Sequence, residues 1–299
     1  MNQSKFGIVT PSYAPDFARC QTLCWSIDKF VAPDINHYIV VDRQDYQLFS
    51  QLAGPRRKII TKESILPWWI KRVPFLNKKN LWLSYKTLPL RGWLVQQIIK
   101  LSAARYTTEE TIVFVDSDVI FVRPFDLNSF VKEGQVRLFK VDNGNVENIK
   151  NAANWDRATN HLIGLSDVEH PHNYVGQIIT WKRDNLLKLY QHIEDSTGKN
   201  WLTALCGSLH LSEYHLYGNF IDCILQERSG HFYDDSHICH QYWDDVSMSK
   251  EQLQAFFAEI PPTCIAVMLS AKADMTLSPE EYQNLVDLVP DRALVGDRT

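Results

Sequence analysis

Two aspartates, Asp116 and Asp118, stand one residue apart directly after the most apolar stretch of the chain, Thr111 to Val115. Carboxylate oxygens are preferred ligands of hard divalent cations, and a cation held there can also take phosphate oxygens as ligands. Apolar residues resume at Val119, so two acids between two buried strands would be costly to desolvate unless a cation neutralised them. We therefore expect a Mn²⁺ or Mg²⁺ site at Asp116 and Asp118 rather than a pair of turn-forming residues.

The chain offers no glycine-rich loop for a phosphate group. It contains 12 glycines among 299 residues, and none of them falls in a G-x-G-x-x-G or a G-x-x-x-x-G-K-[ST] pattern. The phosphates of a bound nucleotide would have to be neutralised in another way. A divalent cation held by carboxylates is the usual alternative, which agrees with the two aspartates.

The elements that must position these acids alternate between strands and helices. Apolar runs predict strands at residues 6–10, 37–41, 58–61 and 111–115, and helical spacing predicts helices at 16–30, 45–52 and 92–106. Such alternation is typical of a mostly parallel sheet covered by helices, in which ligands bind beyond the carboxyl ends of the strands. Residues 67–90 are rich in Trp, Lys and Pro without a clear period, and we expect a long, ordered, substrate-side loop there.

Beyond residue 142 the pattern changes. Residues 143–172 are rich in Asn, Asp and His, and the strands predicted after them are isolated, at 178–181, 231–233 and 264–269. Helices are predicted at 184–195, 212–226, 250–257 and 279–289, and the last one begins with a capping box formed by Ser278 and Glu281. Since no linker rich in Pro, Ser or Gly separates this part from the first, we expect one domain rather than two.

The composition excludes several classes of protein. Hydrophobic residues make up 45% of the chain, which excludes extensive disorder, and a net charge of -4 offers no general attraction for nucleic acid. No run approaches the roughly 18 apolar residues of a membrane span, and residues 1–10 lack the pattern of a signal peptide. Six cysteines without C-x-x-C spacing indicate neither a zinc ribbon nor a disulfide scaffold. We expect a cytoplasmic protein, with the inner face of the membrane as the alternative location.

Several short motifs occur in an order that resembles a known family. They are Val9-Thr10-Pro11-Ser12-Tyr13, Val41-Asp42, Gly92-Trp93 with Gln96-Gln97 and Lys100-Leu101, Asp116-Ser117-Asp118, Ser212-Glu213-Tyr214 with Leu216-Tyr217-Gly218, and His240 with Tyr242-Trp243. The chain resembles the GT-A nucleotide-sugar-dependent glycosyltransferases and, more narrowly, a poorly characterised bacterial glycosyltransferase-like family. The resemblance covers residues 5–245 and implies an α/β fold, a GT-A-like Rossmann-type mixed sheet with helices on both faces. It also implies a single domain over residues 1–299, with a nucleotide-sugar-binding half at 5–141 and an acceptor-side half with a C-terminal tail at 142–299.

The resemblance implies chemical roles for four residues. Asp118 would bind the metal ion that bridges the nucleotide diphosphate, and Asp116 would contact the ribose or donor sugar as well as the metal. His240 would be the third metal ligand, because neutral imidazole suits Mn²⁺, whereas the alternative is a histidine that satisfies a buried backbone group. Glu213 would be the general base for the acceptor hydroxyl, although an acid in the first turn of a helix also complements the helix dipole.

Other residues are implied in donor binding. The segment after the first strand and the acid after the second would hold the base and ribose, while basic and polar side chains near the helix at 92–106 would reach the donor. The candidates are Thr10, Ser12, Tyr13, Asp42, Lys86, Arg91, Gln97, Lys100 and Trp243. Each has an ordinary alternative as a turn residue, a solvated side chain or a packing aromatic.

Taken together, these features predict a metal-dependent glycosyltransferase. It would transfer a sugar from a nucleotide-sugar donor to a hydroxyl acceptor such as a glycan, in polysaccharide or glycoconjugate synthesis. A metal-dependent nucleotidyltransferase is one alternative, but it usually needs a basic, glycine-containing loop that Thr10 to Tyr13 does not provide. A non-catalytic nucleotide- or sugar-binding protein is the other.

Basic and aromatic residues also lie close together at 56–58, 68–72 and 78–79. Such residues favour peripheral contact with an anionic membrane, where lipid-linked or polysaccharide acceptors are presented. The simpler interpretation is a solvated loop with a few packing tryptophans, and both interpretations stay open at this point.

Overall fold

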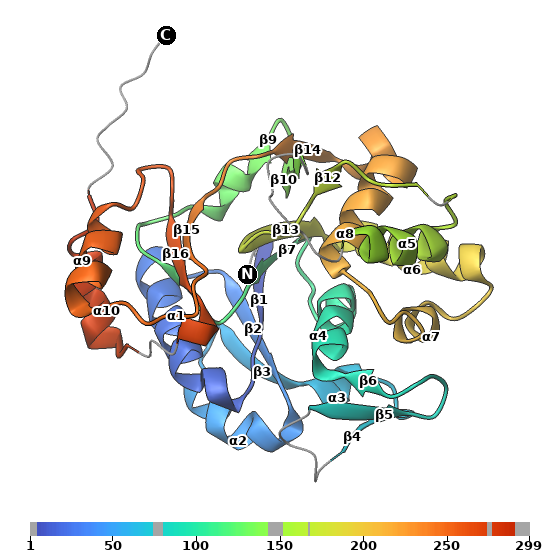
Figure 1. Ribbon diagram of the computed structural model, residues 1–299, viewed down its shortest axis with the longest axis horizontal. Helices are drawn as coiled ribbons and strands as arrows, with labels where there is room; N and C mark the ends of the chain where they lie inside the picture. The colour runs from blue at the N-terminus through green and yellow to red at the C-terminus, as the bar shows by residue number, and fades with distance from the viewer. Residues whose placement is uncertain (1–4, 74–79, 143–151, 167, 274–276, 291–299) are drawn as a thin grey trace.

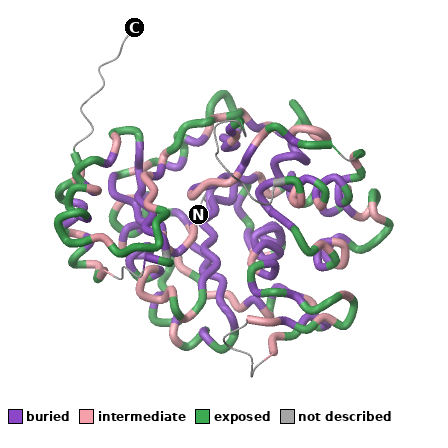
Figure 2. The backbone as a smooth tube through the Cα atoms, in the orientation of Figure 1, coloured by how far each residue is buried: buried purple, intermediate pink, exposed green. Residues whose placement is uncertain are grey.

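The computed structural model describes residues 5–73, 80–142, 152–166, 168–273 and 277–290. Figure 1 shows a central sheet with helices around it, and Figure 2 shows that most of its strands are buried along most of their length. The exception is the edge strand at residues 57–61, which contains no buried residue. No helix in these ranges is both long and apolar enough to cross a membrane.

The central sheet has five strands in the order β13-β7-β1-β2-β3. Four of them are parallel, and β13 pairs with β7 in the antiparallel direction. Their bounds are β1 Phe6–Pro11, β2 Asn36–Val41, β3 Arg57–Thr61, β7 Thr111–Val115 and β13 Ile178–Lys182. The sequence-based prediction of four parallel strands is confirmed, and the fifth predicted strand closes the sheet at one edge.

Helices cover both faces of this sheet because its strands are apolar on both sides. Ile112 and Phe114 of β7 pack in one cluster with Leu94 of α4 (Gly92–Leu101), whereas Val113 packs in another with Leu23 of α1 (Phe17–Phe30). This division follows from the alternation of side chains along a strand. The predicted α/β class, a mixed sheet with helices on both faces, is therefore confirmed.

The order of the strands creates a switch point between β1 and β7. From β1 the chain moves outward to β2 and β3, and it then returns to the other side of β1 to form β7. In open α/β sheets the crevice outside the carboxyl ends of two such strands is the usual place for a ligand. The residues that follow β1 and β7 are therefore the first to consider for a site.

The remaining elements pack around the central sheet in small groups. In one three-stranded sheet β16 pairs with β15 and β8, in another β10 pairs with β14 and β9, and β11 pairs with β12. The bounds of these strands are β8 Val119–Phe121, β9 Val131–Lys132, β10 Gln135–Phe139, β11 Val141–Asp142, β12 His172–Asn173, β14 His231–Asp234, β15 Cys239–Tyr242 and β16 Ala266–Leu269. The helices are α2 Tyr46–Phe49, α3 Lys62–Ile65, α5 Ala152–Ile163, α6 Arg183–Thr197, α7 Trp201–Cys206, α8 Glu213–Asn219, α9 Lys250–Ala258 and α10 Pro279–Val286.

The prediction of a long loop at residues 67–90 is wrong. These residues contain two strands and the start of a third, which pair in the order β4-β5-β6. Their bounds are β4 Ile70–Arg72, β5 Leu81–Ser84 and β6 Leu90–Arg91. The strands have two to four residues each, which is too short for an alternating pattern to be recognised.

The second half of the chain holds further differences from the prediction. Helices α5 and α7 were not expected, and the predicted helix at 212–226 is α8 followed by a π-helical segment, Phe220–Leu225. The capping box predicted for the last helix is present, because the Ser278 hydroxyl accepts from the Glu281 backbone N–H and the Glu281 carboxylate accepts from the Ser278 backbone N–H.

Candidate functional site

A pocket of about 390 Å³ lies at the switch point, beyond the carboxyl ends of β1 and β7. It is lined by Pro11, Ser12, Tyr13, Asp16, Lys62, Asn80, Gly92, Trp93, Gln96, Asp116, Ser117 and Asp118. We call it the strand-end pocket. It contains both aspartates that the sequence singled out, and it draws on the loops after β1, β3 and β7 together with the start of α4.

Three carboxylates share this pocket. Burial and the charge of Asp116 raise the pKa of Asp118 to about 7. Burial also raises the pKa of Asp16, where the charge of Asp116 adds to the effect and Arg19 opposes it. Because the lining contains one ammonium, that of Lys62, against three carboxylates, it favours a cation over a bare anion such as a diphosphate.

Lys100 ties the strand-end pocket to helix α8. Its buried Nζ lies 3.0 Å from Asp116 Oδ1 and 3.3 Å from Glu213 Oε1, and it donates to the Tyr214 hydroxyl at 2.7 Å. Burial alone would lower the pKa of Lys100, but Asp116, Tyr214 and Glu213 together raise it well above its usual value. Lys100 therefore stays charged, and its ammonium orients the Asp116 carboxylate.

A second buried ion cluster supports the opposite wall. Lys62 Nζ lies 2.9 Å from Asp42 Oδ1, and Arg72 Nε lies 3.3 Å from Asp42 Oδ2. Asp42 is 1% exposed and does not line the pocket, but Lys62 does. Asp42, predicted to bind the donor, therefore contacts the side chain that forms the wall.

Seven of the predicted site residues lie in or next to the strand-end pocket. Four of them line the strand-end pocket, namely Ser12, Tyr13, Asp116 and Asp118. Lys100, Glu213 and Gln97 do not line the pocket but are connected to its Asp116. Lys100 contacts both Asp116 and Glu213, and Gln97 Oε1 accepts from the Glu213 backbone N–H at 3.2 Å. Glu213 is 2% exposed, and burial raises the pKa of its carboxyl although Lys100 opposes the effect. Its predicted role as a general base stays a prediction.

His240 is not brought to the two aspartates. Its ring stacks on Phe256 of α9, with the ring centroids 4.4 Å apart. The neighbouring Cys239 is buried, and burial, Cys264 and then Asp118 raise the pKa of its thiol well above its usual value. The contact with Phe256 does not support a place for His240 in the metal site, and its role as the third ligand stays a prediction.

Four predicted donor-binding residues also lie away from the strand-end pocket. The Thr10 hydroxyl pairs with His37 Nε2 at 2.9 Å, and Lys86 Nζ lies 5.3 Å above the Trp69 ring. Arg91 is exposed on β6, and the Trp243 indole donates to Gln241 on an exposed turn. None of the four is among the residues that line the pocket.

The metal prediction has partial geometric support. Within the described residues, no group of three or more His, Cys, Asp and Glu side chains is arranged to hold a metal ion. Asp116 and Asp118 nevertheless line one cavity, in which Lys100 pairs with Asp116 and the pKa of Asp118 is raised to about 7. Mg²⁺ is commonly held by one or two carboxylates plus substrate phosphates and water, and this donor set fits that arrangement better than a closed protein cage.

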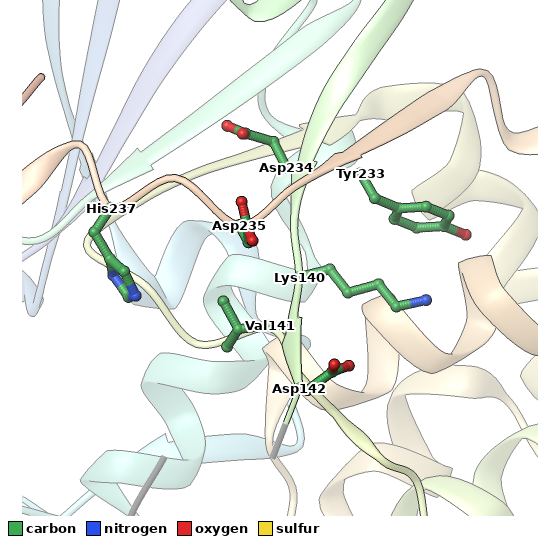
Figure 3. A pocket seen from close by; sticks show the side chains of 7 residues that line it. All are labelled: Lys140, Val141, Asp142, Tyr233, Asp234, Asp235 and His237. Atoms are coloured by element: carbon green, nitrogen blue, oxygen red, sulfur yellow. The ribbon is translucent and has the colours of Figure 1, made fainter. Parts of the chain in front are cut away.

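A larger pocket, of about 600 Å³, lies at the carboxyl ends of the parallel strands β10 and β14. Its lining is Lys140, Val141, Asp142, Tyr233, Asp234, Asp235 and His237 (Figure 3). Lys140 Nζ pairs with Asp222 at 2.5 Å and lies 4.1 Å above the Tyr233 ring, while Arg137 pairs with Asp234 at 2.5 Å. We call it the β10–β14 pocket; it is polar, and Asp142 and Asp235 give it acidic character.

A family model described as a family of unknown function, DUF6492, matches residues 6–281. The chain belongs to this family. The match includes every residue of both pockets. No curated protein matches the chain.

Two solved structures are similar to this member of DUF6492 in overall shape. One is an active-site mutant of LgtC, with 12% identity and a TM-score of 0.46 over 94% of this chain and 95% of that one. The other is the galactosyltransferase LgtC in complex with donor and acceptor sugar analogues, with 10% identity and a TM-score of 0.44 over 95% of this chain and 96% of that one.

Several lining residues of this DUF6492 protein were not predicted as site residues. Asp16 and Lys62 follow β1 and β3, and Trp93 and Gln96 lie at the start of α4. The rule that selected Asp116, a polar residue beyond the carboxyl end of a parallel strand, also applies to Asp16 and Lys62. Asp16 stood at the start of a predicted helix, where an acid is an ordinary first-turn residue, whereas the short helix that begins at Lys62 was not predicted.

Proposed function

We propose that the protein is a glycosyltransferase that binds a nucleotide-sugar donor together with a divalent cation in the strand-end pocket. The observation that carries the proposal is the position of Asp116 and Asp118 at the switch point, in a cavity with three carboxylates and one ammonium. An anionic nucleotide diphosphate fits such a cavity only with a cation between it and the carboxylates.

Asp116 and Asp118 would hold Mn²⁺ or Mg²⁺, with Asp16 close enough to influence both electrostatically. When bound, the cation would offset the charge that develops on the leaving diphosphate. The Lys100 ammonium, 3.0 Å from Asp116 Oδ1, orients the Asp116 carboxylate. Trp93, which is about half exposed at the pocket, offers an aromatic face to the base or sugar of the donor.

The β10–β14 pocket is proposed to receive the hydroxyl acceptor. Its carboxylates, its ammonium and the Tyr233 ring suit a polyhydroxylated molecule, because hydroxyls both donate and accept and sugar rings pack on aromatic faces. The contacts of Glu213 favour a positioning role, since its carboxylate is buried against Lys100 rather than exposed in either pocket.

A nucleotidyltransferase is the less favoured candidate. The loop from Pro11 to Asp16 lines the strand-end pocket with Ser12, Tyr13 and Asp16 and contains no Lys, Arg or Gly. It therefore lacks the basic, glycine-containing loop that such enzymes place against a triphosphate.

The proposal is tested by thermal unfolding in the presence of nucleoside diphosphates and nucleotide sugars, with and without Mn²⁺. A ligand that binds only the folded state raises the melting temperature. We expect a Mn²⁺-dependent rise for one nucleotide, its loss in Asp118→Asn, and its retention in Asp34→Asn, which changes an exposed turn aspartate far from the pocket.

Turnover separates an enzyme from a binding protein. The nucleotide sugar selected by the thermal test is incubated with the protein and a panel of glycan acceptors, and release of the nucleoside diphosphate is measured. If the nucleotide sugar binds but no acceptor causes release of the nucleoside diphosphate, the protein is a non-catalytic nucleotide-binding protein. Absence of any Mn²⁺-dependent shift would refute the proposal.

A further inference from the structure

The small sheet formed by β4, β5 and β6 has one buried face and one exposed face. Ile70, Trp82 and Leu90 are buried, and their pairing across the strands puts them on the inner face. The outer face carries Lys71 opposite Leu83, and Leu81 opposite Arg91. Leucine and basic side chains therefore alternate on the side that faces away from the core.

More apolar side chains lie at the end of this sheet, in the segments that flank β4 and β5. Trp68 is 74% exposed, Tyr85 70% and Leu88 67%, and the rings of Trp68 and Tyr85 lie 6.4 Å apart. Leu83 on the outer face is 44% exposed. Single exposed apolar residues are common on protein surfaces, but a gathering of them indicates an interaction site.

The charge of this part of the chain differs from that of the whole. The sequence from Ser64 to Thr108 contains no Asp or Glu and eight Lys and Arg, although the complete chain has a net charge of -4. On the described surface, Lys71, Lys86 and Arg91 are exposed beside the apolar side chains. A surface with this charge complements an anionic partner.

We propose that this surface docks on an anionic lipid membrane. We define it as the β4–β6 surface, made of Lys71, Leu83 and Arg91 on the outer face and Trp68, Tyr85 and Lys86 at its end. Trp and Tyr place an apolar ring and a polar edge at a bilayer interface, and Lys and Arg bind anionic headgroups while their stems cover apolar surface. Nucleic acid also binds basic residues, but it gives exposed leucines no apolar partner.

The proposed orientation brings the strand-end pocket close to the membrane. Asn80, directly before β5, and Gly92 and Trp93, directly after β6, line that pocket. In Figure 1 the three strands project from one edge of the molecule, so the rest of the protein leaves their outer face accessible. This inference does not depend on the proposed function, because vesicle binding is measured without substrate.

The test is co-sedimentation with vesicles of phosphatidylcholine mixed with phosphatidylglycerol, compared with vesicles of phosphatidylcholine alone. We expect binding to the mixed vesicles that weakens as salt is raised, and little binding to the neutral ones. A Lys71→Gln/Lys86→Gln variant should lose about 30-fold in affinity, since each lysine near an anionic surface contributes about fivefold. Trp68→Ser/Tyr85→Ser should also weaken binding, but with little change in its salt dependence.

A matched variant controls for general effects of charge and aromatic content. Tyr46→Ser/Lys188→Gln removes one exposed aromatic and one exposed lysine on α2 and α6, and it should bind like the wild type. Circular dichroism and thermal unfolding of each variant establish that it is folded. Equal binding to both kinds of vesicle, binding to RNA but to no vesicle, or equal losses in the control variant would each overturn the proposal.

Discussion

Replacing Lys100 by methionine is expected to destabilise the protein strongly. Methionine keeps the unbranched stem of the side chain, one atom shorter, but removes the charge that lies 3.0 Å from Asp116 and 3.3 Å from Glu213. The Glu213 side chain is 3% exposed and would stay buried without its partner, whereas that of Asp116 is 34% exposed and can be partly hydrated. The magnitude therefore depends mainly on Glu213.

Removing one partner of a buried ion pair costs about 3 to 5 kcal/mol, because the other charge remains in the interior. We expect Lys100→Met to lose about 3 kcal/mol, at the lower end, because water offsets part of the loss at Asp116. Adding Glu213→Gln removes the stranded charge. The double variant should lose only about 1 to 2 kcal/mol, the usual cost of an imperfectly bonded buried amide.

The assay is urea unfolding at pH 7 in the absence of divalent metal, for the wild type, both single variants and the double variant. A double variant that is more stable than Lys100→Met alone supports the ion pair. If the losses of the two single variants simply add, Lys100 and Glu213 do not interact energetically, and the reasoning about the wall of the pocket is refuted.

Three further predictions concern the folding of the second half of the chain. Burial lowers the pKa of His231 to about 4, whereas the ordinary value in the unfolded state is near 6.5. Between these pH values the unfolded state binds a proton and the folded state does not, so the free energy of unfolding should fall by about 3 kcal/mol as the pH drops from 6.5 to 4. His231→Gln should remove this part of the pH dependence in urea unfolding. Gly218→Ala should lose at least 2 kcal/mol by the rule for overpacked cores (roughly 1 to 3), since its Cβ would lie 2.2 Å from the Tyr174 ring. Ser278→Ala should lower stability by about 1 kcal/mol in the same assay through loss of the helix cap.

Each of these predictions has its own control. Gly54→Ala places a Cβ where nothing lies within 4 Å, so a loss as large as that of Gly218→Ala would show that close packing is not the cause. A neutral His231 accepts from the Tyr217 hydroxyl and donates to the Val136 carbonyl, both at 2.8 Å. An unchanged pH profile in His231→Gln would mean that burial of this imidazole does not cause the loss of stability at low pH. Ser278→Thr should retain the cap, and equal losses in both Ser278 variants would argue against capping.

The central sheet could be predicted because its strands are apolar on both faces. Val113 and Phe114 are buried on opposite sides of β7, and such uninterrupted apolar runs are recognisable without knowledge of their neighbours. The strands β4 and β5 are different, since each has three or four residues and only one of them is buried. Their assignment depends on pairing with distant segments, which the local sequence does not contain.

The site could be predicted where position along a strand decides it, and not where side-chain direction decides it. Asp116 and Asp118 follow a strand end, and that alone places them at the sheet edge. The position of His240 in β15 follows from the sequence pattern, but the stacking of its ring on Phe256 of α9 depends on a distant segment that motif order does not describe.

The two aspartates of the strand-end pocket differ in their surroundings, and this difference suggests a division of roles. Asp116 forms an ion pair with Lys100, so the charge of its carboxylate is compensated within the protein. The pKa of Asp118 is raised to about 7, because burial and Asp116 act on it more strongly than Arg19 opposes them. A cation in the pocket would therefore gain most of its binding energy from Asp118, while Asp116 would contribute a fixed ligand position. Asp118→Asn, rather than a change at Asp116, is therefore the decisive variant for the proposed function.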